Sequence, residues 1–352
     1  MTISEDIHDL LPLLNQLLLL TAACILVAIV FPRPLLSSSK TKVHVARHSA
    51  RSGGGGDDQE YTITKCPSPN CARCSRYAEL NRSAQRRLPY VARGHALQRI
   101  RCAITAGPNV VRDDDDAESL SPVLGQRPNV LLVRGLTAHP FVTQLHQDAC
   151  RILKILGRNV VLNEYIVAMT SPSARALEND VNRGAWQVLH LMNQGEWINS
   201  NVSLCPKTMD ALRSFGEGSI MEGCIFGNVF ISVLHPGTII DPHCGPSNVR
   251  HRLHFSLQVP NAREGDEAPH LCVAREKTIW REGECFVFDD SIVHSVAFGE
   301  DVISSEQTSK RDVGTGNCRV VLIVDLWHPD LTREERRALS DLYPSARCSI
   351  DL

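Results

Sequence analysis

The C-terminal half of this 352-residue chain breaks into short apolar runs, and their rhythm limits the fold more than any other feature. Each run ends at Pro, Gly or an Asp-Asp pair, as the strands of sandwiches and barrels do. The runs cover residues 229–234, 253–259, 285–288, 294–298 and 319–327. They predict a mainly β fold, either a sandwich or a jelly-roll barrel.

Helices are expected around this β-rich part. Apolar residues between 142 and 156 recur at helical spacing, and the arginine-rich stretch 75–106 indicates one or two short helices. Residues 186–192 and Trp197 are typical of strands on either side of a turn at Gly195. Near the C-terminus, Thr332 and Glu335 have the spacing of a capping box, which predicts a closing helix.

Two histidines and an arginine carry the candidate chemistry. His243 precedes Gly-Pro, and His294 follows the chain reversal at Asp-Asp, so both are expected at strand ends. Arg319 opens an apolar run, where a guanidinium needs a carboxylate partner. The pattern suits a barrel that binds a metal and a dicarboxylate. However, the carboxylate that usually completes a non-haem iron site is absent, because its position is Gly245.

Residues from about 220 to 335 resemble the aspartyl/asparaginyl β-hydroxylase family of iron- and 2-oxoglutarate-dependent oxygenases. The segments that carry the resemblance are ISVLHPGT at 231–238, PHCGPSN at 242–248, RHRLH at 250–254, FDDS at 288–291 with His294, and VDLWHP at 324–329. A weaker match extends upstream to Trp186. The apolar N-terminal segment and Cys66, Cys71 and Cys74 are similar to the short, single-pass branch of the family, the aspartate β-hydroxylase domain-containing proteins. The resemblance implies a double-stranded β-helix, the cupin-like form of the jelly-roll barrel.

The resemblance also implies roles for individual residues. His243 and His294 match the two iron ligands, and Gly245 matches a glycine that this family has in place of a carboxylate. Asp290 matches an acidic residue that acts through water bound to the metal. Arg250 matches a residue that faces the acidic or amide side chain of a substrate. The residues matched to the cosubstrate pocket are Trp186, Ser232, Arg252, Leu253, His254 and Arg319, the last clamping the distal carboxylate of 2-oxoglutarate.

The implied activity is that of a dioxygenase that uses Fe(II), 2-oxoglutarate and O2, hydroxylates Asp or Asn in a protein substrate, and releases succinate and CO2. EGF-like domains are the best-known targets of the family. Two other readings stay open: a catalytically inactive jelly roll acting as a scaffold at the membrane, and a jelly roll that binds another metal or small acid. Two departures bear on activity, namely an insertion at 299–317 and Asp241 in place of a bulky apolar residue.

Leu10 to Phe31 carry no charged side chain and are long enough to span a bilayer. The expected organisation is an N-terminal tail at 1–9, a transmembrane anchor at 10–32, a flexible stalk at 33–60, a Cys-containing and partly helical juxtamembrane region at 61–125, and an oxygenase domain at 126–347. Basic residues after the anchor favour a cytoplasmic domain. The resemblance favours the lumen of the endoplasmic reticulum or another endomembrane, where the sequons at Asn81 and Asn201 would matter.

The 13 cysteines are too dispersed for a disulfide framework and leave the redox compartment open. Cys285 and Cys318 lie in or beside apolar runs and are expected to be small buried hydrophobes. Cys66, Cys71 and Cys74 could bind zinc, form a disulfide, be acylated or stay free. The net charge of −2, without a basic stripe, argues against nucleic acid as a partner.

Overall fold

The computed structural model describes residues 72–92, 94–107, 126–179, 181, 183–260, 268–299 and 317–345. The expected tail, anchor and stalk lie outside these residues, as do Cys66, Cys71 and most of the insertion before Arg319. Within the described ranges, no helix is both long enough and apolar enough to cross a membrane.

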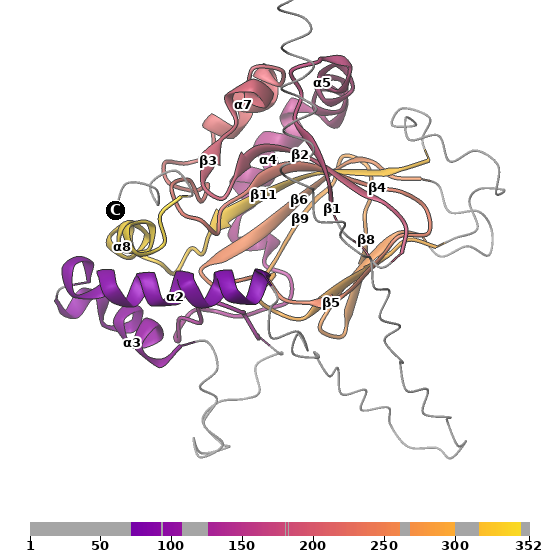
Figure 1. Ribbon diagram of the computed structural model, residues 1–352. Helices are drawn as coiled ribbons and strands as arrows, with labels where there is room; N and C mark the ends of the chain where they lie inside the picture. Colours follow the sequence, from indigo (N-terminus) through magenta and orange to yellow (C-terminus); the bar gives the residue numbers. More distant parts are fainter. Residues whose placement is uncertain are drawn as a thin grey trace, which may run out of the picture. The chain divides into compact units, whose positions relative to one another are not determined.

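Two antiparallel sheets form the centre of the fold (Figure 1). The seven-stranded sheet has the order β1-β2-β4-β11-β6-β9, with β3 paired to β2. Its strands are β1 (Ala176–Asn179), β2 (Trp186–Asn193), β3 (Glu196–Trp197), β4 (Val229–Leu234), β6 (Arg250–Gln258), β9 (Cys285–Phe288) and β11 (Arg319–Trp327). The four-stranded sheet has the order β5-β10-β7-β8, with β5 (Ile239–His243), β7 (His270–Val273), β8 (Glu276–Ile279) and β10 (His294–Ala297).

The central strands of the large sheet are buried on both faces. Every residue of β11 and of β4 is buried, so these strands read as continuous apolar runs rather than as alternating ones. One face packs against the small sheet through a cluster that includes Phe230, Ile323, Val273 and Val296. The candidate site lies on this inner face.

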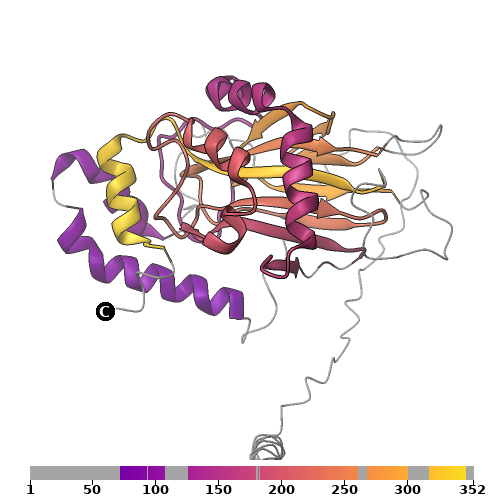
Figure 2. The same cartoon turned by 90° about the horizontal axis from the view of Figure 1, so that it is seen from above.

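Helices cover the other face of the large sheet. The cluster there joins β2, β4, β6 and β11 to α4 (Gln147–Leu156), α5 (Arg158–Thr170) and α7 (Pro206–Arg213). Figure 2 shows α4 and α5 lying against the strands. The short helices η2 (Thr143–Leu145) and α6 (Asn199–Val202) complete this layer.

A third cluster packs the N-terminal helices α2 (Ala72–Val91), η1 (His95–Leu97) and α3 (Gln98–Ala106) with the C-terminal helix α8 (Arg333–Leu342). Thr332 caps α8 in a capping box with Glu335, as the sequence predicts. The same glutamate receives Arg99 Nε at 2.5 Å. The helical part of the expected juxtamembrane region therefore packs in the same compact unit as the sheets.

The predicted strands at 229–234, 285–288 and 319–327 are confirmed, and β6 begins at Arg250, three residues before its predicted start. β7 and β8 were not predicted, and β5 was expected only as a strand ending near His243, without bounds. β5 contains Asp241-Pro242 and is mostly exposed, while β8 carries Glu276 and Lys277, so neither shows an apolar run. The expectation for Cys318 is confirmed, but Cys285 is partly exposed because it opens a strand at the edge of the sheet.

Candidate active site

Two histidines from the small sheet lie side by side. His243 is the last residue of β5, His294 is the first residue of β10, and the two are directly paired across these antiparallel strands. Their ring centroids are 4.2 Å apart, with an angle of 53° between the ring planes. Both positions at strand ends agree with the sequence analysis. This strand pairing brings His243 and His294 together although they are 51 positions apart in sequence.

Backbone carbonyls select the tautomer of both imidazoles. His243 Nδ1 lies 2.8 Å from the carbonyl oxygen of Asp241, and His294 Nδ1 lies 2.9 Å from that of Ile292. A carbonyl only accepts, so each Nδ1 carries the proton and each Nε2 carries the lone pair. Burial, together with the neighbouring His243, lowers the pKa of His294 to about 3. His294 is therefore neutral, and both rings are oriented by their carbonyl contacts, as the ligands of a divalent metal are.

The place of a third protein ligand is filled by Asp290. A Cβ on Gly245 would lie 2.5 Å from Asp290 Oδ2 and 2.6 Å from its Cγ, so position 245 cannot hold a side chain without moving this carboxylate. The Gly245 N–H also donates to the Asp290 carbonyl at 2.6 Å. Among the residues that the structure describes, there is no group of three His, Cys, Asp or Glu side chains suited to a metal ion. The pair of oriented histidines is therefore the candidate position for a metal ion.

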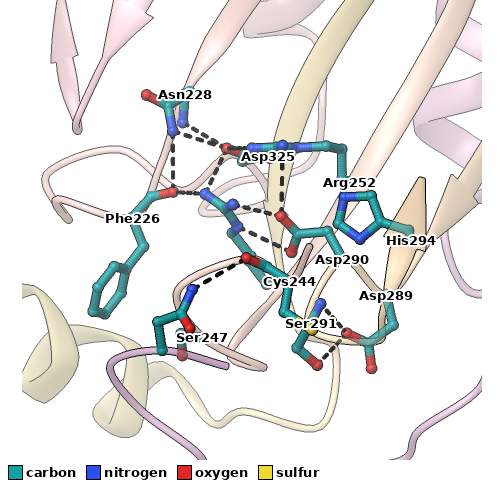
Figure 3. A network of polar contacts seen from close by, with 12 residues as sticks. Phe226, Asn228, Cys244, Ser247, Arg252, Asp289, Asp290, Ser291, His294 and Asp325 are labelled. Atoms are coloured by element: carbon teal, nitrogen blue, oxygen red, sulfur yellow. Dashed lines mark hydrogen bonds and ion pairs between the residues drawn. The ribbon is translucent and has the colours of Figure 1, made fainter. Parts of the chain in front are cut away.

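Asp290 belongs to a buried network of two arginines and two aspartates (Figure 3). Arg250 donates to Asp290 from Nε at 3.2 Å and from Nη2 at 2.5 Å, and to Asp325 from Nη1 at 2.9 Å. Arg252 donates to Asp325 at 2.8 and 3.0 Å, with its Nη1 3.5 Å from Asp290. Asn228 adds a backbone and a side-chain donor to Asp325 at 3.0 and 3.1 Å.

The network keeps both aspartates fully buried. Burial by itself would raise the pKa of Asp290, but the two neighbouring guanidinium groups outweigh it and hold the pKa well below its usual range. Asp290 is therefore a carboxylate beside the histidine pair. It can accept a hydrogen bond from a water molecule but cannot donate one.

Arg319 is buried in a different way. Its Nη2 donates to Ser232 Oγ at 2.8 Å, and the same hydroxyl accepts from Trp186 Nε1 at 3.0 Å. The guanidinium carbon lies 4.7 Å from the centre of the Trp280 ring. Its Nε has no hydrogen-bond partner, and no carboxylate of the described residues pairs with it. Burial lowers the pKa of Arg319 to about 9, and no aspartate or glutamate opposes that effect.

This contrast separates the three inward-facing arginines. Arg250 and Arg252 each bind both Asp290 and Asp325, so the protein itself compensates their charge. Arg319 is only 2% exposed and lacks such a partner within the described part of the chain. A buried, uncompensated cation is costly, and an anionic ligand would remove that cost. Arg319, with Ser232 and Trp186 beside it, is therefore the candidate partner for a carboxylate ligand.

Comparison with known proteins identifies the family. The sequence profile described as aspartyl/asparaginyl beta-hydroxylase matches residues 159–329. The mouse (Mus musculus) protein "Aspartate beta-hydroxylase domain-containing protein 2" is 30% identical over 338 residues, which cover 93% of this chain and 90% of the mouse protein. The chain belongs to the aspartyl/asparaginyl β-hydroxylase family.

Other relatives match shorter parts. The human "Aspartate beta-hydroxylase domain-containing protein 1" is 34% identical over 73% of this chain and 61% of its own length. The human "Aspartyl/asparaginyl beta-hydroxylase" is 33% identical over 59% of this chain but only 25% of its own length. A solved 2OG-Fe(II) oxygenase family oxidoreductase from Burkholderia pseudomallei is similar over 44% of this chain and 74% of its own length, at 11% identity and a TM-score of 0.29.

In this β-hydroxylase family member, the residues matched to the cosubstrate pocket do not all face the same way. Trp186, Ser232, Arg252, His254 and Arg319 have polar contacts on the inner face, with His254 Nδ1 accepting from Trp280 Nε1 at 3.2 Å. The side chain of Leu253 instead packs into the cluster under the helices, because neighbouring strand residues point to opposite faces. Only the backbone of Leu253 could contribute to a pocket.

Arg250 lies deeper than its predicted role implies. It is 3% exposed, and its guanidinium binds Asp290, Asp325 and the carbonyl of Phe226. Contact between this residue and a substrate stays a prediction. Asp325, by contrast, was given no role from sequence. A lone aspartate inside the apolar run of β11 is the signal that could have found it, since a buried charge must be paired.

Proposed function

We propose that this protein is an Fe(II)- and 2-oxoglutarate-dependent dioxygenase that hydroxylates an Asp or Asn side chain of a protein substrate. The observation that carries the proposal is Arg319, a buried cation without a carboxylate partner in the described chain. It lies on the large sheet, on the face that packs against the small sheet, and the small sheet carries the two paired histidines. Family membership supports the reaction class. The two facing antiparallel sheets support the finer fold assignment, a double-stranded β-helix.

Different side chains would bind the metal and the cosubstrate. His243 and His294 would hold Fe(II) through Nε2, since each Nδ1 is committed to a carbonyl. Arg319 would pair with the distal carboxylate of 2-oxoglutarate, while Ser232 Oγ fixes the guanidinium. Bound together, Fe(II), 2-oxoglutarate and O2 supply the oxidation of a C–H bond, with succinate and CO2 as products.

Asp290 would complete the site without binding the metal itself. Its carboxylate fills the space above Gly245 and stays ionised, so it would orient water beside the histidine pair. Arg250 and Arg252 hold Asp290 in place from the opposite side. Arg252 and His254 would lie toward the other end of the cosubstrate. The ring of His254 contacts the buried rings of Trp280 and Phe288.

Succinate formation tests the proposal. The purified full chain should convert 2-oxoglutarate to succinate with Fe(II) and O2, and an EGF-like domain containing Asp or Asn should raise the rate and gain one oxygen atom. His243→Ala should abolish succinate formation, whereas His95→Ala, at an exposed position outside the site, should not. Iron-dependent succinate formation that is unchanged in His243→Ala would rule out this site. A wild-type chain that binds partners but forms no succinate would favour the inactive scaffold.

We further propose that the chain is anchored by residues 10–32, with the described domain on the lumenal side of an endomembrane. The structure shows which of the two sequons can be used to test the orientation. Asn201 is fully buried, and its amide bonds Arg175 N at 2.9 Å, Arg175 O at 3.3 Å and His190 O at 2.7 Å. A glycan there would break these contacts, so Asn201 is not a usable reporter.

Asn81, on α2, is partly exposed and is the sequon that can report orientation. In cells, a glycosidase-sensitive mass shift that disappears in Ser83→Ala would support the lumenal arrangement. The absence of a shift, together with protease access to the domain from the cytoplasmic side, would contradict it and agree with the charge bias around the anchor.

A further inference from the structure

A groove on the outer side of the fold contains two cysteines that the proposed hydroxylase chemistry does not use. Cys150 lies on α4, and Cys285 is the first residue of β9. The groove has a volume of about 430 Å³, and its lining includes Cys150, Cys285, Lys154 and Arg151. Its position at the edge of the large sheet explains why Cys285 is only partly buried, although its sequence context is apolar.

The two cysteine side chains lie next to each other. Cys285 Sγ lies 3.9 Å from the carbonyl oxygen of Cys150, and both side chains line the same groove. The interaction with Cys285 lowers the pKa of Cys150 despite burial, and the Lys154 ammonium adds to the effect. The interaction with Cys150, together with burial, raises the pKa of Cys285. Of the two sulfurs, Cys150 is the one whose thiolate form the surroundings favour.

Lys154 is the cation that lowers the pKa of Cys150. It lies one helical turn after Cys150 on α4, so both side chains are on the same face of the helix. Its ammonium pairs with Glu284, the residue immediately before Cys285. The ion pair bridges α4 and the start of β9, next to the two cysteines.

Other buried cysteines lack these features. Burial raises the pKa of Cys205 and of Cys224 to about 12, and no thiol is among the causes for either. Such thiols are inert toward oxidants because the thiolate is the reactive form. The pair in the groove therefore differs from the general cysteine content of the chain.

We propose that Cys150 and Cys285 form a redox-active dithiol that closes reversibly to a disulfide, with a peroxide as the oxidant. The Cys150 thiolate attacks one oxygen of hydrogen peroxide, the O–O bond breaks, and the released hydroxide takes up the former thiol proton to leave as water. Cys150 is then a sulfenic acid.

The second step closes the bond. Cys285 loses its proton and its sulfur attacks Cys150 Sγ; the S–S bond forms, the S–O bond breaks, and the leaving hydroxide combines with that proton as a second water. The two sulfurs together lose two electrons, and the peroxide gains them. A small dithiol reductant reverses the change by thiol–disulfide exchange.

The disulfide would act on the strand that leads into the candidate site. β9 pairs with β6, with Phe288 opposite Arg252, and Asp290 follows two residues after the strand ends. A covalent link from α4 to Cys285 fixes the beginning of this strand. The site and the groove therefore share β9, although they lie on different parts of the molecule.

Peptide mapping of the oxidised full chain tests the proposal. The reduced protein is treated with increasing hydrogen peroxide, blocked with an alkylating reagent, digested without reduction and analysed by mass spectrometry. A linked peptide pair containing Cys150 and Cys285 should appear at peroxide concentrations that leave Cys205 alkylated, and dithiothreitol should restore both thiols. Cys102, which is exposed, serves as the internal reference for an unassisted thiol.

Two variants sharpen the result. In Cys285→Ser, Cys150 should still be oxidised but should accumulate as a sulfenic acid that a dimedone-type probe traps, whereas Cys205→Ser should form the same linked pair as the wild type. The proposal is overturned if Cys150 and Cys285 are both recovered as alkylated thiols once Cys102 has been oxidised. It is equally overturned if either one pairs only with other cysteines.

Discussion

Gly245→Ala is the substitution whose effect the structure specifies most sharply. The added Cβ would lie 2.5, 2.6 and 2.8 Å from Oδ2, Cγ and Oδ1 of Asp290. Ordinary contact between such atoms is about 3.5 Å, so the carboxylate would have to move by roughly 1 Å. Gly245 is not among the residues with a positive φ, so the cost comes from space and not from backbone strain.

Asp290 cannot move by that distance and keep its partners. It receives Arg250 at 2.5 and 3.2 Å, and its own carbonyl accepts from Gly245 N at 2.6 Å. If the carboxylate stays, overpacking costs about 1–3 kcal/mol. If it leaves, a buried ion pair is broken at a cost of about 3–5 kcal/mol. We therefore expect Gly245→Ala to lower the free energy of unfolding by about 3 kcal/mol.

Urea denaturation measures this loss. With a slope of about 3 kcal/mol per molar urea, the midpoint should fall by about 1 M. Gly216→Ala is the control, because its Cβ would meet only Ser219 Oγ, at 3.3 Å. In an Asp290→Ala background the clash is absent, so Gly245→Ala should then cost little. A midpoint within about 0.2 M of the wild type for Gly245→Ala alone would refute the packing argument.

The other predictions concern buried charge. Asp325→Asn should lower the free energy of unfolding by about 3–5 kcal/mol, because Asp290 would then be the only carboxylate paired with Arg250 and Arg252. Calorimetry should show this as a lower Tm, and an unchanged Tm would contradict the prediction. Arg319→Met should raise the free energy of unfolding of the ligand-free protein by about 1–3 kcal/mol, because it removes an uncompensated cation; a decrease would show that the charge is balanced. Burial lowers the pKa of His146 to about 4. Between pH 6.5 and 4, this histidine is therefore neutral in the folded protein but protonated in the unfolded chain. Stability should therefore fall by about 3 kcal/mol as the pH drops from 6.5 to 4, and His146→Gln should remove that part of the slope; an unchanged slope in the variant would contradict it.

Local sequence patterns predict the strands that carry a continuous apolar run. β4, β9 and β11 fall at their predicted bounds, and Thr332 caps α8 as its spacing indicates. β8 could not be found this way, because it lies at the edge of the small sheet and is mostly exposed. Its stability comes from pairing with β7 rather than from a pattern of its own.

The candidate site likewise has some features that local sequence predicts and others that depend on distant contacts. Motif resemblance locates His243 and His294 because they lie in or beside short recognisable segments, and Arg319 because it opens a buried apolar run. Which arginine is compensated depends on contacts across 40 to 75 positions of sequence, as between Arg250 and its partners Asp290 and Asp325. Asp290 also occupies the space that a side chain at position 245 would need. The sequence around Gly245 does not reveal this contact, because Asp290 lies far along the chain.

Anaerobic titration of 2-oxoglutarate into the Fe(II)-loaded full chain tests the central claim most directly. The wild type should bind, and Arg319→Met should bind about a hundredfold more weakly, since a charge-assisted contact of about 3 kcal/mol is lost. Arg213→Met, which changes an exposed arginine of α7, should bind as the wild type does. Equal affinity of the wild type and Arg319→Met would show that the buried guanidinium does not hold the cosubstrate.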